Sequence, residues 1–213
     1  MSAIADFQQI LAWLRRLANL DTRVFDEVRT NPTATIPGLM VAAVAIFVSG
    51  IGGWLWWVVE DYGRASDIFV NSALIGSLLA VVLWVLVWLG IVYVMLTQVF
   101  RERAYVEQLL RVMGLAASPL ALMGLMFVPG LSLAIGLASL ALTFGLTNIA
   151  IRSVTTADPA RILVANLGGF FVWAAALALL ASAGASSVEP HAPGIFLYHS
   201  IAGVAGDILS ITG

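Results

Sequence analysis

Five long apolar stretches constrain the fold of this 213-residue chain more than any other feature. They span residues 36–59, 69–100, 109–128, 131–151 and 162–183. Arg111 is the only formally charged residue within them. A helix needs about 20 apolar residues to cross a hydrocarbon core of about 30 Å, and five segments this poor in charge are not typical of one soluble domain. The sequence therefore predicts an integral membrane protein.

The composition and the pattern of these stretches predict an all-α fold. Hydrophobic residues make up 61% of the chain and charged residues 10%. Backbone groups in lipid need partners within their own segment, and the stretches lack the period-2 alternation of a membrane β-barrel. We expect a five-helix bundle over residues 34–183, preceded by an N-terminal region, 1–33, and followed by an apolar tail, 184–213. The absence of cysteine excludes disulfides and thiolate metal sites.

The arginines predict the orientation, because the chain has ten Arg and no Lys. Nine of them fall on one side of the predicted membrane: Arg15, Arg16, Arg23, Arg29, Arg101, Arg103, Arg111, Arg152 and Arg161. Only Arg64 falls on the other. The positive-inside rule then predicts a cytoplasmic N-terminus, and an odd number of spans predicts an external C-terminus. Exclusive use of Arg suggests a high-GC bacterial genome, and hence the bacterial inner membrane.

The N-terminal region reads as an amphipathic helix rather than a cleavable signal peptide, because no basic segment precedes a short apolar core. Its apolar residues recur at helical spacing: Ile4, Phe7, Ile10, Leu11, Leu14, Leu17 and Ala18. Such a helix is expected to lie in the membrane interface, or to dock a protein partner. Asp21 is expected to N-cap a second short helix that Asn31 and Pro32 end.

Turn signals and small residues divide the membrane region further. Pro129 and Gly130 predict a tight external hairpin, and Asp158 followed by Pro159 predicts the start of the fifth helix. The second stretch has 32 residues and would be about 48 Å long as one helix, so it should tilt or project. Small residues four apart allow close helix contact in three places: Gly114 with Ser118, Ser132 with Gly136, and Ala141 with Gly145.

Polar side chains near or within the spans are the candidate site residues. Arg103, Glu107 and Arg111 are spaced four apart and predict one stripe at the start of the third helix. This stripe either fixes the depth of the helix or, with Arg152 and Arg161, binds anionic lipid headgroups or a partner. Asn148 and Asn166 are expected to hydrogen-bond to each other across the bundle.

The sequence predicts no catalytic, cofactor or metal site. No Asp, Glu or His lies within the five stretches. His191 and His199 are eight residues apart without the Glu of a zinc-binding helix motif, and Asp207 stands alone in the tail. The apolar segment 195–211 is expected to be a capping or interfacial helix, or a docking helix for a larger complex. We predict a non-enzymatic protein that contacts membrane lipids and no nucleic acid.

Three segments carry a resemblance to a known family. They are VFDEVRTNPTATIPGLMV at 24–41, VEQLLRVMGLAASPLAL at 106–122 and LTNIAIRSVTTADPARIL at 146–163. Over residues 24–183 the chain resembles the bacterial branch of the Yip family, the Ypt-interacting or Rab-GTPase-interacting membrane proteins. The resemblance implies a cytoplasmic N-terminus, a compact five-helix bundle and a non-catalytic role. Eukaryotic members serve membrane trafficking with small GTPases through an acidic, aromatic N-terminal segment that this chain lacks, so that role is not carried over.

The sequence thus favours a membrane scaffold, adaptor or organiser of the Yip type. A small transporter or lipid-handling protein is the first alternative, and an accessory subunit of a larger membrane complex is the second. A water-filled cavity at the middle of the membrane would favour transport. Stoichiometric co-purification with other chains would favour a subunit.

Overall fold

The computed structural model describes residues 3–60, 69–128 and 130–183, and this part of the chain is helical without any strand. Its elements in chain order are α1 (Ala3–Ala18), α2 (Val24–Thr30), η1 (Pro32–Ala34), α3 (Thr35–Glu60), η2 (Phe69–Gly76), α5 (Ser77–Leu83), η3 (Trp84–Leu89), α6 (Gly90–Val94), η4 (Met95–Val99), α7 (Val106–Ala116), η5 (Ser118–Leu125), α8 (Ser132–Val154) and α9 (Pro159–Ala183). The predicted all-α class is confirmed. The tail with His191, His199 and Asp207 lies outside the described residues, as do Arg64 and Pro129.

Five of the described segments are long and apolar enough to cross a membrane. They are Pro32–Trp56, Ala73–Val99, Val106–Leu125, Ser132–Val154 and Pro159–Leu177. Each overlaps one of the five apolar stretches of the sequence, so the structure supports the prediction of a multi-pass membrane protein. Most of the side chains that face outward on these helices are hydrophobic, as expected for surfaces that contact lipid.

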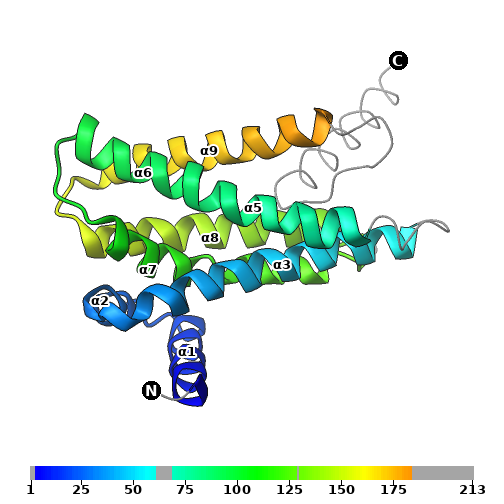
Figure 1. Cartoon of the computed structure of the whole chain (residues 1–213), viewed down its shortest axis with the longest axis horizontal. Coiled ribbons are helices and arrows are strands. Elements are labelled where there is room, and N and C mark those ends of the chain that lie inside the picture. Colours follow the sequence, from blue (N-terminus) through cyan, green and yellow to red (C-terminus); the bar gives the residue numbers. More distant parts are fainter. Residues whose placement is uncertain (1–2, 61–68, 129, 184–213) are drawn as a thin grey trace.

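The second of these segments is one continuous rod in Figure 1, built from α-helical turns that alternate with the π-helical turns of η2, η3 and η4. It ends where Arg101 adopts a left-handed conformation with φ of 56°, which is uncommon for a residue other than glycine. The amide of Glu102 then donates to the carbonyl of Leu96 at 2.9 Å and closes the end of the helix.

The third segment is not the single helix expected from residues 109–128. It begins earlier, at Val106, and its α-helical part ends at Ala116, where the 3₁₀-helical η5 follows from Ser118. Pro119 explains the break, because it lacks a backbone N–H and disfavours helical geometry at the preceding residue. The hydroxyl of Ser139 on α8 donates to the Pro119 carbonyl at 2.6 Å and holds the break against the neighbouring helix.

Tight turns place the last two long helices as the sequence predicts. The amide of Leu131 donates to the carbonyl of Val128 at 3.2 Å, and Gly130 has φ of 76°, which turns η5 into α8. A carboxylate oxygen of Asp158 accepts from the amide of Ala160 at 2.9 Å at the start of α9. The predicted N-cap of the fifth helix is therefore confirmed.

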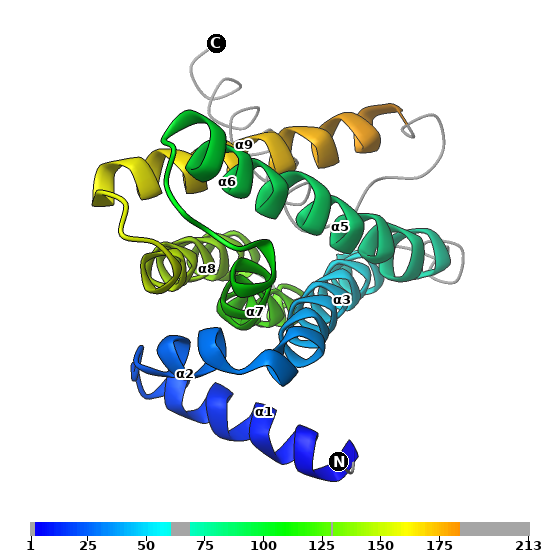
Figure 2. The same cartoon turned by 60° about the vertical axis from the view of Figure 1, so that its left-hand side comes forward.

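Glycine and tryptophan set the distances between the helices. A Cβ on Gly114 of α7 would overlap the backbone of Gly38 on α3. The two helices can lie this close because both positions are glycine. On the other side of the bundle Trp88 is fully buried, and its ring lies 5.3 Å from that of Trp173 on α9 between centroids. Figure 2 shows α9 beside the rod formed by α5 and α6.

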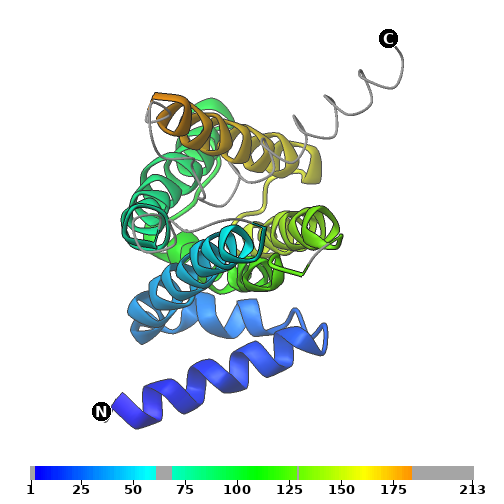
Figure 3. The same ribbon diagram turned by 90° about the vertical axis from the view of Figure 1, so that its right-hand side faces the viewer.

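The short N-terminal helices lie across one end of the long ones. Figure 1 shows α2 at the same end as the 100–105 and 155–158 connections, with the Val128–Leu131 turn at the opposite end. Figure 3 shows α1 outermost, then α2, then α3, α7 and α8, with α9 and the α5–α6 rod farthest away. We call the end that carries α2 the arginine-rich end, because the arginines of the 23–29, 101–111 and 152–161 segments belong to it.

Candidate functional site at the arginine-rich end

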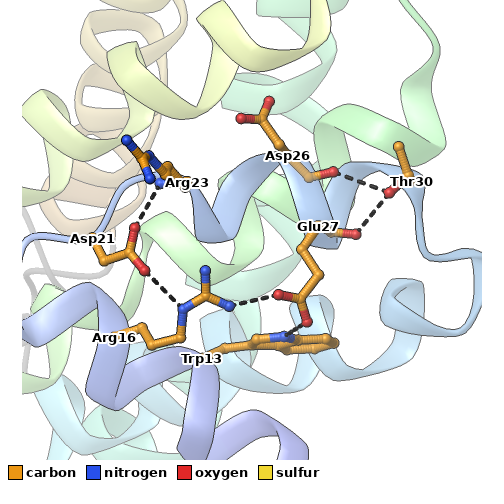
Figure 4. A network of polar contacts seen from close by, with 7 residues as sticks. All are labelled: Trp13, Arg16, Asp21, Arg23, Asp26, Glu27 and Thr30. Atoms are coloured by element: carbon orange, nitrogen blue, oxygen red, sulfur yellow. Dashed lines mark hydrogen bonds and ion pairs between the residues drawn. The ribbon is translucent and has the colours of Figure 1, made fainter.

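A polar network joins α1 to α2, and Figure 4 shows how its side chains converge. The indole N–H of Trp13 donates to a Glu27 carboxylate oxygen at 2.8 Å. The guanidinium of Arg16 lies between two carboxylates, pairing with Asp21 at 2.9 Å and with Glu27 through its Nη1. Glu27 therefore receives hydrogen bonds from two side chains of α1, which fixes the angle between the two helices.

The same contacts perturb the titration of the network. The hydrogen bond from Arg16 lowers the pKa of the Asp21 carboxyl. The hydrogen bond from Trp13, followed by that from Arg16, lowers the pKa of the Glu27 carboxyl. Exposed ion pairs contribute little to stability because water and salt screen them. We infer that the network orients α1 while apolar packing supplies most of its attachment.

That packing comes from one face of each short helix. Trp13 and Leu17 of α1 are buried, and so are Val24, Phe25 and Val28 of α2. Burying a side chain of this size is worth about 1.5–3 kcal/mol, more than an exposed ion pair. The short helices are therefore packed elements of the fold.

The predicted cap of α2 is only partly present. Asp21 accepts from the amide of Arg23 at 3.2 Å, so its carboxylate stabilises the turn that leads into α2. The N-cap position itself is Arg23, which has no side-chain capping bond. The end of α2 is as expected, because Asn31 follows its last turn and accepts from the amide of Thr33 at 3.1 Å.

Arg111 has a structural environment that the sequence did not predict. Its Nε donates to the Thr35 hydroxyl at 2.8 Å, and its Nη1 donates to the Arg29 carbonyl at 3.0 Å. It therefore ties α7 to the end of α2 and the start of α3. A cation is favourable at the C-terminus of a helix, where carbonyl groups lack intrahelical partners. Among the described residues, no carboxylate forms an ion pair with Arg111.

The predicted stripe of Arg103, Glu107 and Arg111 is wrong. Arg103 precedes the first residue of α7 and is not helical, so helical spacing does not apply to it. Glu107 is exposed in the first turn of α7, where a negative charge is favourable, and Arg111 turns inward. The three side chains therefore have separate surroundings.

The other three predicted basic residues, Arg103, Arg152 and Arg161, remain at the surface. Arg161 at the start of α9 pairs with Glu102 at 3.1 Å and lies 5.9 Å from the centre of the Phe100 ring. This contact brings the 100–103 segment beside α9. Arg103 and Arg152 are exposed. The structure thus keeps Arg103, Arg152 and Arg161 on the outside at this end, while Arg111 is partly buried between α7, α2 and α3.

Asn166 is the centre of a buried network, but its partner is not Asn148. Its side-chain oxygen accepts from the indole N–H of Trp88 at 2.8 Å, and its amide donates to the Thr147 hydroxyl at 2.9 Å and to the Phe144 carbonyl at 3.3 Å. Asn148 donates to the same Phe144 carbonyl, at 3.0 Å, within its own helix. The predicted bond between the two asparagines is therefore wrong. The network joins three of the long helices.

Some participants carried no usable signal in the sequence. Trp88 and Thr147 occur in apolar helices without a motif, and Trp13 and Glu27 belong to different helices, so their pairing depends on tertiary packing. Within residues 3–60, 69–128 and 130–183, no group of three or more His, Cys, Asp or Glu gathers as metal ligands do.

Comparison with known proteins adds no assignment. No family model matches the chain, and no curated protein or solved structure matches it.

Proposed function

We propose that this chain is a non-catalytic membrane scaffold or adaptor of the Yip type in the bacterial inner membrane, with a cytoplasmic N-terminus and an external C-terminus. One observation carries the proposal. The α1–α2 unit is fixed to the arginine-rich end by buried side chains and by the Trp13–Arg16–Glu27 network. A folded, charged surface held at the end of a membrane bundle is suited to binding a partner.

The orientation is supported by where the basic residues gather. The exposed Arg103, Arg152 and Arg161 belong to the same end as α2. Arginine concentrates on the cytoplasmic side of membrane proteins, so this end is assigned to the cytoplasm. The amphipathic α1 runs across the first part of α3, next to α2, as expected for a helix in the membrane interface.

The outer surface of the α1–α2 unit offers the partner contact. Arg15, Arg23 and Asp26 are exposed and take no part in an ion pair among the described residues. Figure 4 shows the Asp26 carboxylate pointing away from Trp13 and the α1–α2 contact. We call Arg15, Arg23 and Asp26 the outer charged surface. Its mixed charge favours a polar protein surface of complementary charge.

The transporter alternative receives less support from the polar groups in the spans. Asn166, Trp88 and Thr147 bond to one another, and Ser139 bonds to the Pro119 carbonyl. These groups join helices, whereas residues along a transport path face a water-filled cavity. The accessory-subunit alternative uses the same outer charged surface and differs only in the size of the complex.

The test is co-purification from native membranes in mild detergent after crosslinking. We expect a protein at fixed stoichiometry with the wild-type chain and its loss from the triple variant Arg15→Glu, Arg23→Glu, Asp26→Arg. Thr156→Glu, an exposed residue at the same end but outside the α1–α2 unit, is the matched control and should retain the partner. Equal recovery with the triple variant, or no stoichiometric protein with any chain, would contradict the adaptor role.

A further inference from the structure

An apolar groove of about 220 Å³ separates α1 from α3 and η5. Three elements far apart in the sequence form its walls. It is lined by Phe7, Ile10, Leu11, Leu14, Met40, Val41, Val44, Ala45, Ser118 and Ala121. We call it the α1–α3 groove. Among the lining residues that the structure describes, Ser118 alone has a polar side chain.

The groove follows from how α1 is attached. Trp13 binds Glu27, so α1 is held against α2 and crosses α3 without packing closely along it. Small side chains, Ala45, Ser118 and Ala121, line the region where α3 meets η5. The break before Pro119 ends α7 and positions η5 beside α3. Because α1 is held away from α3 and the side chains opposite it are small, the described residues leave the space between them unfilled.

The position of the groove along α3 places it within the hydrocarbon part of the proposed membrane span. Its α3 and η5 walls belong to the candidate spans Pro32–Trp56 and Val106–Leu125. Met40 and Ala45 follow Thr35 by five and ten residues, which places them about 8 and 15 Å further along the helix axis than the Arg111 contact. The groove therefore begins on the hydrocarbon side of the arginine-rich end.

The rim is apolar and open. Phe7 and Leu11 on α1 are 60% and 50% exposed, and Met40 and Val44 on α3 are 53% and 57% exposed. Ligand sites for whole small molecules usually enclose about 300–1,000 Å³, so this groove has room for less. An open groove at membrane depth, apolar except for Ser118, fits a segment of a linear hydrocarbon chain. The apolar face of an interfacial helix reaches this depth, about 5–10 Å into the boundary of headgroups and chains.

We propose that the α1–α3 groove binds one acyl chain of a membrane phospholipid from the leaflet on the arginine-rich side. The bound chain fills the space between α1 and the long helices and so becomes part of the contact between them. This inference rests on the membrane placement of the long helices and not on the adaptor role. Lipid tails and apolar side chains are equally hydrophobic, so selectivity must come from packing in the groove.

Photolabelling tests the proposal with the full chain in vesicles of phosphatidylcholine and phosphatidylglycerol. A trace of phosphatidylcholine carries a diazirine on one acyl chain, and the sites of attachment are mapped by mass spectrometry. We expect labelling of Met40 and Val44 several-fold above that of Leu78 and Leu86. These control residues on the α5–α6 rod are at least as exposed, at 65% and 68%, but do not line the groove.

Two variants separate a specific site from general lipid contact. Ala121→Phe fills the groove and should reduce labelling of Val44 to the level of Leu86. Phe7→Ala removes an exposed wall of the groove without touching the packed core and should reduce it as well. Equal labelling of groove and control residues overturns the proposal. So does unchanged labelling in both variants.

Discussion

Replacing Asn166 by Leu should destabilise the bundle measurably, because this side chain joins three long helices through one buried network. The change removes its bonds to Trp88, Thr147 and the Phe144 carbonyl. Interhelical hydrogen bonds in membranes average about 0.6 kcal/mol and reach about 1.7, so the loss of three predicts about 2 kcal/mol. Thr147 keeps its own bond to the Phe144 carbonyl, but the Trp88 N–H is left buried without a partner.

A double-mutant cycle isolates the Trp88 contact. Trp88→Phe removes the N–H and keeps an aromatic ring, so Asn166→Leu should cost less in that background by about 0.6–1.7 kcal/mol. The assay is reversible unfolding in lipid–detergent mixtures with increasing sodium dodecyl sulfate, followed by tryptophan fluorescence. Asn148→Leu is the matched control, because Asn148 bonds only within its own helix among the described residues. Equal free energies of unfolding for Asn166→Leu and Asn148→Leu would refute the reasoning.

Two further predictions concern helix contact and pH. Gly114→Ala should lower the free energy of unfolding by about 1–3 kcal/mol, because the added Cβ would overlap the backbone of Gly38. Gly145→Ala should be neutral or stabilising by up to about 1 kcal/mol, because nothing lies within 4 Å of an added Cβ there. The same unfolding assay checks both variants, and equal effects would contradict the close approach of α7 to α3. The carboxyls of Asp21 and Glu27 have lowered pKa values in the folded protein, so their contribution is complete above their ordinary pKa values of 3.8 and 4.5 and is lost as pH falls through the folded values. Amide hydrogen exchange of α1, measured relative to α8 in the same sample, should therefore accelerate in acid. Glu27→Gln should weaken this pH dependence. If the exchange of α1 depends on pH in the same way in that variant, the role of Glu27 is contradicted.

The sequence predicts the helical fold well because its signals are local. Charge-poor stretches of span length lead to helices, and Asp158 caps α9 as its position before Pro159 indicates. The break in the third segment also had a local signal. Proline disfavours helical geometry at the residue before it, so Ser118 and Pro119 together indicate a break within the long apolar run.

Contacts between helices were not predictable from such signals. Gly114 and Gly145 both have a small residue four positions away, yet only Gly114 meets a neighbouring backbone. Asn148 and Asn166 are both polar residues in apolar helices, but the rotation of each helix decides that Asn166 faces Trp88. The spacing alone predicts Arg111 in a surface stripe, but its bond to the Arg29 carbonyl at the end of α2 turns it inward. Each outcome depends on how the helices pack.

The central claim is that the arginine-rich end faces the cytoplasm, and the accessibility of single cysteines tests it most directly. The chain has no cysteine of its own, so one substitution gives one labelling site. Thr156→Cys lies at the arginine-rich end, and Leu131→Cys lies at the opposite end; both residues are exposed. In spheroplasts, a membrane-impermeant maleimide should label Leu131→Cys at once and Thr156→Cys only after permeabilisation. The reverse pattern, or immediate labelling of both, would contradict the orientation.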